Sequence, residues 1–252
     1  MIASPIAVCI SSRDTMIARG AVNHDNLIIC SPTTLLSDNK QVNQDSLQHN
    51  NRCQAANVSN GTKCSLVNSR SIREKTMDIR EFILEHKLDF LFITETWLSG
   101  NSSDGVYISE VKPIGYTFSN FPRTVRRGGG LALLHKDGIR VSSSRPKDYD
   151  SFEWIESIAH TNHGRFKFIL IYRPPPSVAN RLTVNAFLAD FSDLLDIYSC
   201  DNTPFAILGD LNVRINIPGD RETVKFTNLL ESHGLVQLVN EPTHRSAILS
   251  IT

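Results

Sequence analysis

Short apolar runs, separated by glycine, proline and polar residues, recur from about residue 62 to the end of the chain. Runs of this length between such breakers are typical of buried strands. They occupy residues 63–67, 89–95, 131–134, 166–172, 204–210 and 235–239. Other stretches place apolar residues at helical spacing, which predicts helices over residues 72–87, 182–198 and 226–233. This alternation of strands and helices predicts an α/β domain.

Polar residues stand at the ends of four of these predicted strands. They are Asn68, Glu95, Tyr172, Asp210 and Asn212. Ligands of α/β proteins commonly gather at the carboxyl edge of the sheet. Five such positions indicate one shared edge with a functional site. For Tyr172 alone, the competing interpretation is a half-buried core tyrosine.

The most informative run ends in Gly209-Asp210-Leu211-Asn212. Residues two apart in an extended chain point the same way, so the Asp210 carboxylate and the Asn212 amide are expected to face one spot. Gly209 allows a backbone segment or a ligand to approach closely just before them. The competing interpretation is a strand that ends in an Asx-type turn.

The five strand-end side chains together suit metal-assisted hydrolysis of a phosphodiester bond. A carboxylate holds a hard cation such as Mg²⁺ through its oxygen atoms. A second carboxylate can orient a water molecule, while amide and phenol groups can donate hydrogen bonds to phosphate oxygens.

The first quarter of the chain differs in composition from the remainder. Residues 1–60 contain no Phe, Tyr or Trp, and residues 39–60 are rich in Asn and Gln without a helical or strand period. Such a segment buries too little apolar surface to offset the entropy of ordering it. We therefore expect a disordered leader over residues 1–61 and a folded domain over residues 62–252.

Charge and cysteine content narrow the possible partners. The 252 residues carry 26 Lys+Arg and 26 Asp+Glu, a formal net charge of +0, so contact with nucleic acid would be local. Arg123, Arg126 and Arg127 precede three glycines and are candidate phosphate contacts, with a solvated loop as the alternative. The five cysteines form no CxxC pair, which favours a reducing compartment. No segment resembles a signal peptide or a membrane span.

Six short motifs, in this order, give the sequence a family resemblance. They are Leu66-Val67-Asn68, Ile93-Thr94-Glu95-Thr96-Trp97-Leu98, Arg127-Gly128-Gly129-Gly130, Ile171-Tyr172-Arg173-Pro174-Pro175, Leu208-Gly209-Asp210-Leu211-Asn212 and Glu241-Pro242-Thr243-His244. Together they resemble the endonuclease/exonuclease/phosphatase superfamily, and within it the apurinic-endonuclease-like domain of LINE-type (non-LTR) retrotransposons. Gly-Asp-x-Asn is shared with many members, whereas Glu-Thr-Trp-Leu, Arg-Gly-Gly-Gly and Tyr-Arg-Pro-Pro together indicate the retroelement branch.

The resemblance implies a four-layered α/β sandwich, with two mixed β-sheets face to face and helices outside. The implied activity is a Mg²⁺-dependent endonuclease, with Mn²⁺ as an alternative metal. Its substrate would be double-stranded DNA, nicked to supply a 3′-hydroxyl for reverse transcription. The expected protein is an intracellular monomer that makes no membrane contact and acts in the nucleus.

The resemblance also implies roles for individual residues. Glu95 would bind the metal, with Asn68 beside it as a metal-side and catalytic residue. Asp210 would orient or deprotonate the attacking water. Asn212 and Tyr172 would hold the scissile phosphate. Thr243 would lie near the DNA strand, which Arg126 and Arg127 are also expected to contact.

The C-terminal residues depart from the family pattern. Where the family continues into a Leu-Asp pair this chain has Leu249-Ser250, and none of its eight histidines lies in the family's closing Ser-Asp-His motif. We therefore expect a C-terminally truncated domain without its last strand, impaired or inactive as a nuclease. The alternative is a non-catalytic retroelement remnant that binds DNA weakly at most. A phosphatase of small phosphate esters is a third possibility, which the retroelement-type motifs disfavour.

Overall fold

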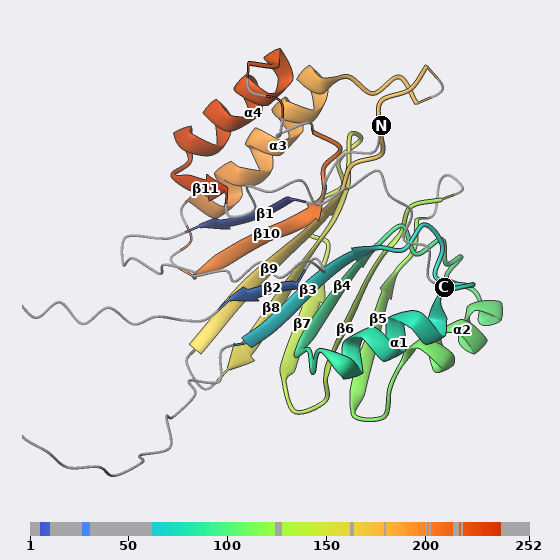
Figure 1. Ribbon diagram of the computed structural model, residues 1–252. Helices are drawn as coiled ribbons and strands as arrows, with labels where there is room; N and C mark the ends of the chain where they lie inside the picture. Colours follow the sequence, from blue (N-terminus) through green and yellow to red (C-terminus); the bar gives the residue numbers. More distant parts are fainter. Residues whose placement is uncertain are drawn as a thin grey trace, which may run out of the picture.

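Two mixed β-sheets lie face to face in the computed structural model, and helices cover their outer faces (Figure 1). The structure describes residues 6–10, 27–30, 62–123, 128–161, 164–178, 180–199, 201, 203–213, 217 and 219–237. Residues 6–10 and 27–30 are described at the level of the backbone. The arrangement is the four-layered α/β sandwich that the family resemblance implies.

The first sheet has six strands in the order β11-β1-β10-β9-β8-β7. Their bounds are β1 Ile6–Ile10, β7 Arg140–Ser144, β8 Glu153–Thr161, β9 Gly164–Tyr172, β10 Phe205–Asp210 and β11 Leu235–Gln237. Strands β9 and β10 run parallel, and the other neighbours run antiparallel. In this register Asp210 stands beside Tyr172, so two of the predicted site residues end adjacent strands.

The second sheet has five strands in the order β2-β3-β4-β6-β5. Their bounds are β2 Leu27–Cys30, β3 Thr62–Asn68, β4 Phe90–Thr94, β5 Tyr116–Phe121 and β6 Leu131–Lys136. The parallel pair here is β3 and β4, and it places Asn68 opposite Thr94. Each sheet thus contributes one parallel pair to the edge where the polar residues stand.

Helices pack on the outer face of each sheet (Figure 1). Helices α3 (Val184–Ser199) and α4 (Arg221–Ser232) share a buried apolar cluster with β9 and β10. Helices α1 (Thr76–Glu85) and α2 (Gly105–Val111) share one with β4 and β6. In the part of the chain that the structure describes, no helix has the length and apolar character needed to cross a bilayer.

Aromatic side chains fill the space between the two sheets. The ring of Phe168 on β9 lies 5.0 Å, centroid to centroid, from both Phe90 and Phe92 on β4. Every residue of β4 is buried, because α1 and α2 cover one of its faces and the first sheet covers the other. Burial on both faces explains why this strand reads as a continuous apolar run rather than an alternating one.

Two elements differ from their predicted extents. Helix α1 begins at Thr76 rather than near residue 72, and the residue before it, Lys75, has a non-helical backbone with φ −130° and ψ 15°. Helix α2, with the short 3-10 helix Ser102–Asp104 before it, occupies a stretch for which the apolar pattern predicts no helix. The Asp104 carboxylate accepts hydrogen bonds from the backbone N of Ser99 and Gly100 at 2.6 and 2.7 Å and so fixes this turn.

The predicted leader over residues 1–61 needs correction at two segments. Strand β1 lies between β10 and β11, and β2 pairs with β3 at the edge of the other sheet. Both are short apolar runs, Ile-Ala-Val-Cys-Ile and Leu-Ile-Ile-Cys, whose β-branched residues favour strands even without aromatic anchors. The boundary at residue 62 stays a prediction, since the remainder of 1–61 lies outside the described residues.

Candidate active site

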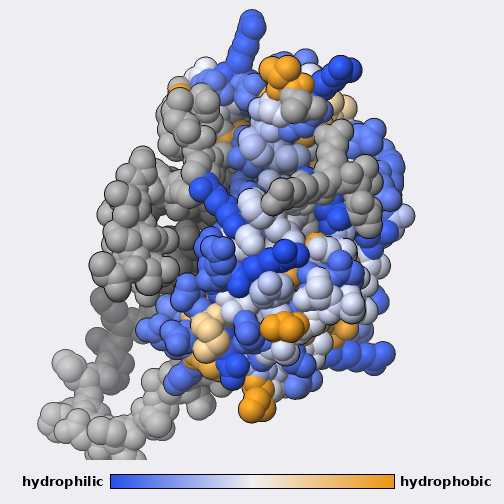
Figure 2. All heavy atoms as spheres, turned by 90° about the vertical axis from the view of Figure 1, so that its right-hand side faces the viewer, coloured by the Kyte–Doolittle hydropathy of each residue, from blue (hydrophilic) through white to orange (hydrophobic). Residues whose placement is uncertain are grey.

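The carboxyl ends of β9 and β10 in one sheet and of β3 and β4 in the other meet at the same edge of the sandwich. In Figure 1 these ends point to the right. Figure 2 looks onto this side, where the described surface is mostly hydrophilic with isolated hydrophobic residues. The edge is therefore suited to a polar ligand rather than to an apolar one.

Asn68, at the end of β3, joins the two sheets through its side-chain amide. Its Nδ2 donates to Glu95 Oε1 at 2.8 Å and to Asp210 Oδ2 at 2.7 Å. Its Oδ1 accepts from the backbone N of Arg70 at 3.1 Å, which fixes the orientation of the amide. The structure thus brings three of the predicted site residues into direct contact, across a sequence separation of more than a hundred residues for Asn68 and Asp210.

Two residues of this edge have a left-handed backbone that non-glycine residues rarely adopt. Glu95 has a φ angle of 55° and Asn212 one of 50°. The Glu95 carbonyl accepts from the Ser71 backbone N and the Ser69 hydroxyl, both at 2.9 Å, which holds that turn. Backbone strain of this kind costs of order 1–3 kcal/mol per residue and clusters at functional sites. At Glu95 the left-handed turn places the side chain within hydrogen-bond distance of Asn68.

Burial raises the pKa of the Asp210 carboxyl to about 6. The residue is 3% exposed. Hydrogen bonds from Asn68 and from the Asn212 backbone lower the pKa, and the nearby Glu95 charge raises it. Burial has the largest effect. With a pKa of about 6, the carboxylate is ionised at neutral pH yet basic enough to take a proton from water.

Tyr172, at the end of β9, hydrogen-bonds to Glu95, and its pKa lies well above the ordinary value. Burial is the main cause, followed by the negative charge of Glu95. The Arg123 guanidinium lies 5.7 Å from the centre of the Tyr172 ring. The phenol therefore stays protonated at any physiological pH and can donate a hydrogen bond. Its contacts favour the site interpretation over that of an ordinary core tyrosine.

Contrary to the prediction from the sequence, the Asn212 side chain does not face the same spot as the Asp210 carboxylate but bonds to the Arg173 backbone. The Asn212 backbone N donates to Asp210 Oδ1 at 3.3 Å, which is the Asx-type turn considered as the alternative. Its Nδ2 donates to the Arg173 carbonyl at 2.6 Å. The period-two argument fails here because the positive φ of Asn212 ends the extended conformation. The turn and the polar cluster coexist, so the two interpretations are not exclusive.

Arg173 holds the whole Asp210–Asn212 segment, a function that the sequence did not indicate. Its backbone N donates to the Asp210 carbonyl at 2.9 Å and its Nη1 to the Leu211 carbonyl at 3.3 Å. The side chain is 1% exposed and packs on the Phe187 ring, 4.4 Å from its centre. An arginine at a strand end followed by prolines reads as a surface residue, so only its position in a motif could have drawn attention to it.

Gly209 allows a backbone approach, as the sequence predicts. A Cβ placed on it would lie 2.0 Å from the Ile171 carbonyl oxygen on the neighbouring strand. Only glycine fits at this distance without a shift of β9 or β10. The residue thus lets the two parallel strands deliver Tyr172 and Asp210 side by side.

Arg123 has a partner inside the protein, which argues against the solvated-loop interpretation for this residue. Its guanidinium forms an ion pair with Glu153, and the Glu153 Oε2 accepts from the Gly130 backbone N at 2.8 Å. Both side chains are mostly buried. Arg126, Arg127 and Thr243 lie outside the described residues, so their predicted contacts with DNA stay predictions.

The oxygen donors of the cluster suit a hard divalent cation. Glu95 and Asp210 supply carboxylates, the donor type that Mg²⁺ and Mn²⁺ prefer, whereas Asn68 presents its amide nitrogen to both carboxylates and its amide oxygen to the Arg70 backbone N. The described residues contain no group of three or more His, Cys, Asp or Glu arranged to hold a metal. A cation at this cluster would therefore have few protein ligands, with water and substrate oxygens completing its shell, as is usual for Mg²⁺.

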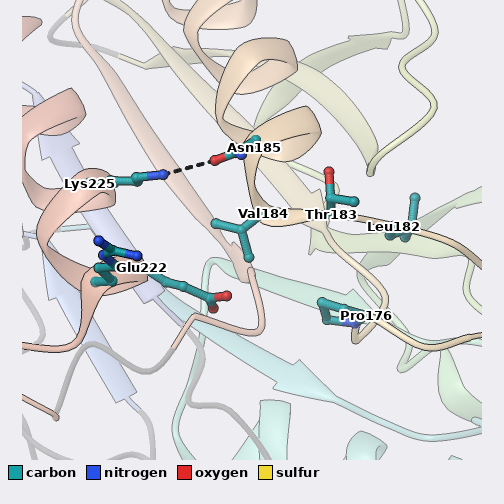
Figure 3. A pocket seen from close by; sticks show the side chains of 8 residues that line it. Pro176, Leu182, Thr183, Val184, Asn185, Glu222 and Lys225 are labelled. Carbon is teal, nitrogen blue, oxygen red and sulfur yellow. Dashed lines mark hydrogen bonds between the residues drawn. The ribbon is translucent and has the colours of Figure 1, made fainter.

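A separate hollow of about 440 Å³ opens between the first turns of α3 and α4 (Figure 3). Lys225 on α4 points to Asn185 on α3 and donates to its Oδ1 at 3.0 Å. The N-terminus of α4 is already capped by Asp220, whose Oδ2 accepts from the backbone N of Glu222 and Thr223. None of the five strand-end residues lines this hollow, so its chemistry is distinct from that of the cluster.

Comparisons with known proteins agree with this architecture. Residues 56–245 match the model of the Endonuclease/Exonuclease/phosphatase family. The AP endonuclease LMAP from Leishmania major superposes with a TM-score of 0.53 at 18% identity, over 68% of this chain and 66% of that one. The match therefore spans just under two thirds of LMAP.

Two further structures superpose less closely. An AP endonuclease from Archaeoglobus fulgidus gives a TM-score of 0.47 at 17% identity, covering 68% of this chain and 70% of that one. The endonuclease domain of TRAS1, a telomere-specific non-LTR retrotransposon, gives 0.47 at 12% identity, covering 69% and 71%. A comparison with curated proteins found no match. The superposition on LMAP, at 18% identity, establishes the fold alone.

Proposed function

Because the chain belongs to the Endonuclease/Exonuclease/phosphatase family, we propose that it hydrolyses a phosphodiester bond of double-stranded DNA with the help of a divalent cation. The observation that carries this proposal is the Asn68 bridge between the Glu95 and Asp210 carboxylates. It joins two buried strand ends from different sheets at a polar edge. A cluster of this kind has no evident structural purpose that apolar packing would not serve better.

Glu95 and Asn68 would hold the cation, Mg²⁺ by preference and Mn²⁺ as the alternative. The Glu95 carboxylate is a hard oxygen donor of the kind that these ions require, and Asn68 would join it by turning its amide oxygen from the Arg70 backbone N to the ion. When bound, the ion supplies positive charge beside the phosphate oxygens on which negative charge develops. The hydrogen bond from Tyr172 holds the Glu95 carboxylate in place for this purpose.

Asp210 is the proposed general base. Its raised pKa, about 6, keeps it ionised near neutral pH while leaving it able to accept a proton from the attacking water. Asn68 and the Asn212 backbone donate to its two oxygens and so fix the direction in which it faces.

Asn212 and Tyr172 are the proposed phosphate contacts. An amide nitrogen carries two hydrogens, and Asn212 uses one of them for the Arg173 carbonyl, which leaves one for a phosphate oxygen. The Tyr172 phenol, kept protonated by its surroundings, is the second proposed donor, and its single hydrogen would have to turn from the Glu95 carboxylate to a phosphate oxygen when DNA binds. Arg126, Arg127 and Thr243 remain proposed contacts with more distant parts of the DNA.

The retroelement branch is the proposed biological setting. It rests on the Glu-Thr-Trp-Leu, Arg-Gly-Gly-Gly and Tyr-Arg-Pro-Pro motifs of the sequence. In that setting the protein would act in the nucleus and would leave a 3′-hydroxyl at the nick for reverse transcription.

Binding of DNA without efficient cleavage is a second candidate function. Histidines 86, 135 and 233 bond to partners outside the cluster, and among the described residues no histidine bonds to Asn68, Glu95 or Asp210. An acid near the leaving group typically contributes about 10²- to 10⁴-fold to the rate. Its absence from the described part of the cluster favours slow turnover.

A plasmid-nicking assay separates these candidates. We expect slow nicking that requires Mg²⁺ and falls at least about 100-fold in Asp210→Ala. The matched control is Asp148→Ala, because the Asp148 side chain is 88% exposed and makes no contact with the cluster. Nicking that survives in Asp210→Ala would refute the proposed base. Binding of duplex DNA without nicking would favour the second candidate, and extension of the nick by a polymerase would show its 3′-hydroxyl.

A further inference from the structure

The two tryptophans of the chain lie in opposite environments. Trp154 on β8 is 1% exposed, and its Nε1 donates to the Lys147 carbonyl at 2.7 Å. Trp97 is 41% exposed and follows Glu95 by two residues. Its neighbours Thr96 and Leu98 are 0% and 3% exposed, so the ring projects outward between two buried side chains.

The backbone of Trp97 is held in a strained conformation. The residue has a φ angle of 54°, which bulky residues rarely adopt. Its backbone N donates to the Gly129 carbonyl at 2.9 Å, and Thr96 N donates to the Gly130 carbonyl at 3.2 Å. A Cβ on Gly128 would lie 3.6 Å from Trp97 Nε1, so the indole rests against that glycine. An exposed ring is thus fixed on a rigid backbone rather than left to swing freely.

Trp97 lies at the same edge of the sandwich as the proposed site of phosphodiester hydrolysis, because it follows Glu95 by two residues. Glu95 contacts Asn68 and Tyr172 within the cluster, and Arg70, an exposed residue at the same edge, lies close enough to Asp210 to lower its pKa. When DNA binds with a phosphate at this cluster, the bases attached to the two neighbouring sugars lie close to the same edge. An indole offers a flat apolar face on which any base can stack.

We propose that Trp97 is a stacking platform for a nucleobase displaced from the duplex next to the cleaved bond. This inference rests on the proposed function and adds to it a preference for DNA with an unstacked base. Stacking on an aromatic side chain is worth roughly one order of magnitude in affinity. Because the contact is uncharged, it strengthens binding without changing the number of phosphates that the protein neutralises.

The test is a binding cycle in the Asp210→Asn background, which prevents cleavage. The probes are a short duplex with a central two-thymidine bulge and the same duplex with abasic residues in the bulge. We expect Trp97→Leu to weaken binding of the first probe about tenfold and of the abasic probe by less than twofold. Trp97→Phe, which keeps an aromatic face, should retain most of the affinity. The slope of affinity against salt should be the same for all three proteins.

Fluorescence provides an independent readout, because only two tryptophans emit and Trp154 is buried. The bulged duplex should quench the emission of the Asp210→Asn protein but not that of its Trp97→Phe form, in which only Trp154 remains. Equal loss of affinity for both probes, or no loss for either, would overturn the stacking inference while leaving the proposed hydrolase intact. Failure of the Asp210→Asn protein to bind any duplex would overturn both.

Discussion

At the scale of the residue, Asp210 carries a cost in stability that fits its proposed role as a base. Hydrogen bonds from Asn68 and Asn212 favour its charged form, yet burial outweighs them and raises the pKa from 3.8 to about 6. A carboxylate selected for stability alone would be paired or exposed, with its pKa lowered. The raised pKa is typical of residues that exchange protons during a reaction.

Replacing Asp210 with asparagine should stabilise the fold at neutral pH. In the unfolded chain the carboxyl ionises near pH 3.8, and in the folded chain near pH 6. The stability it contributes is therefore present below about pH 4 and is lost as the pH rises through 6. Above pH 7 we expect Asp210→Asn to be more stable than the native chain by about 1–3 kcal/mol, since the buried charge is removed and the introduced amide keeps one acceptor oxygen for Asn68, although the long hydrogen bond from the Asn212 backbone N is lost.

Urea unfolding of both proteins between pH 4 and pH 8 measures this difference. The gap should widen from pH 4 to about pH 6.5 and then stay constant. Asp148→Asn, at an exposed position, should show no such pH dependence. A native chain that is as stable as Asp210→Asn at pH 7.5 would contradict the raised pKa.

The meeting of the strand-end residues at one edge could be predicted from the sequence, but not their bonding. Strand-end position was enough to select Asn68, Glu95, Tyr172 and Asp210, because buried strands are readable from apolar runs. The left-handed turns at Glu95 and Asn212 were not readable, since neither residue type requires a positive φ. The anchoring by Arg173 was equally hidden, because a buried arginine depends on tertiary partners far along the chain.

At the level of elements, continuous apolar runs between residues 62 and 237 were predicted as strands, whereas β7 and β8, in which apolar and polar residues alternate, were not. Strands β4, β9 and β10 read as continuous apolar runs. Strand β7, with exposed Ser and Arg in alternation, lies at the edge of its sheet and carries a weak signal. Helix α2 is only seven residues long, too short for its period to emerge from the surrounding loop.

Gly209→Ala tests whether the close approach of β9 and β10 is as tight as the structure indicates. The new methyl group would meet the Ile171 carbonyl, and neither strand can move without disturbing the parallel ladder. Overpacking a core usually costs about 1–3 kcal/mol, and a clash with backbone should reach or exceed the upper end. Chemical unfolding measures the loss.

Gly105→Ala is the matched control for this change. Gly105 begins α2, has a φ angle of −56°, and has no atom within 4 Å of an added Cβ. It should be neutral or slightly stabilising, because alanine favours a helix by up to about 1 kcal/mol over glycine. Equal effects at the two positions would mean that β9 and β10 are further apart than described.

At the scale of the whole molecule, the candidate site depends on both sheets and on the strands that support them. Asn68 belongs to one sheet and Asp210 to the other, so their hydrogen bond forms only when the two sheets are packed together. The described aromatic core between Phe90, Phe92 and Phe168 holds that packing. A substitution that loosens either sheet should therefore weaken the hydrogen bond between Asn68 and Asp210 before the protein unfolds.

Deletion of residues 1–61 tests the one correction that concerns the whole architecture. Strand β1 pairs with β10 along five residues, from Ile6 opposite Gly209 to Ile10 opposite Phe205, and separates β10 from β11. Without it, the strand that carries Asp210 would expose unpaired backbone groups, which invites aggregation. We expect the shortened protein to unfold at lower urea concentration than the full chain and to be less soluble. A stable, soluble protein beginning at residue 62, with unchanged urea midpoint, would restore the interpretation of the first 61 residues as a leader outside the domain.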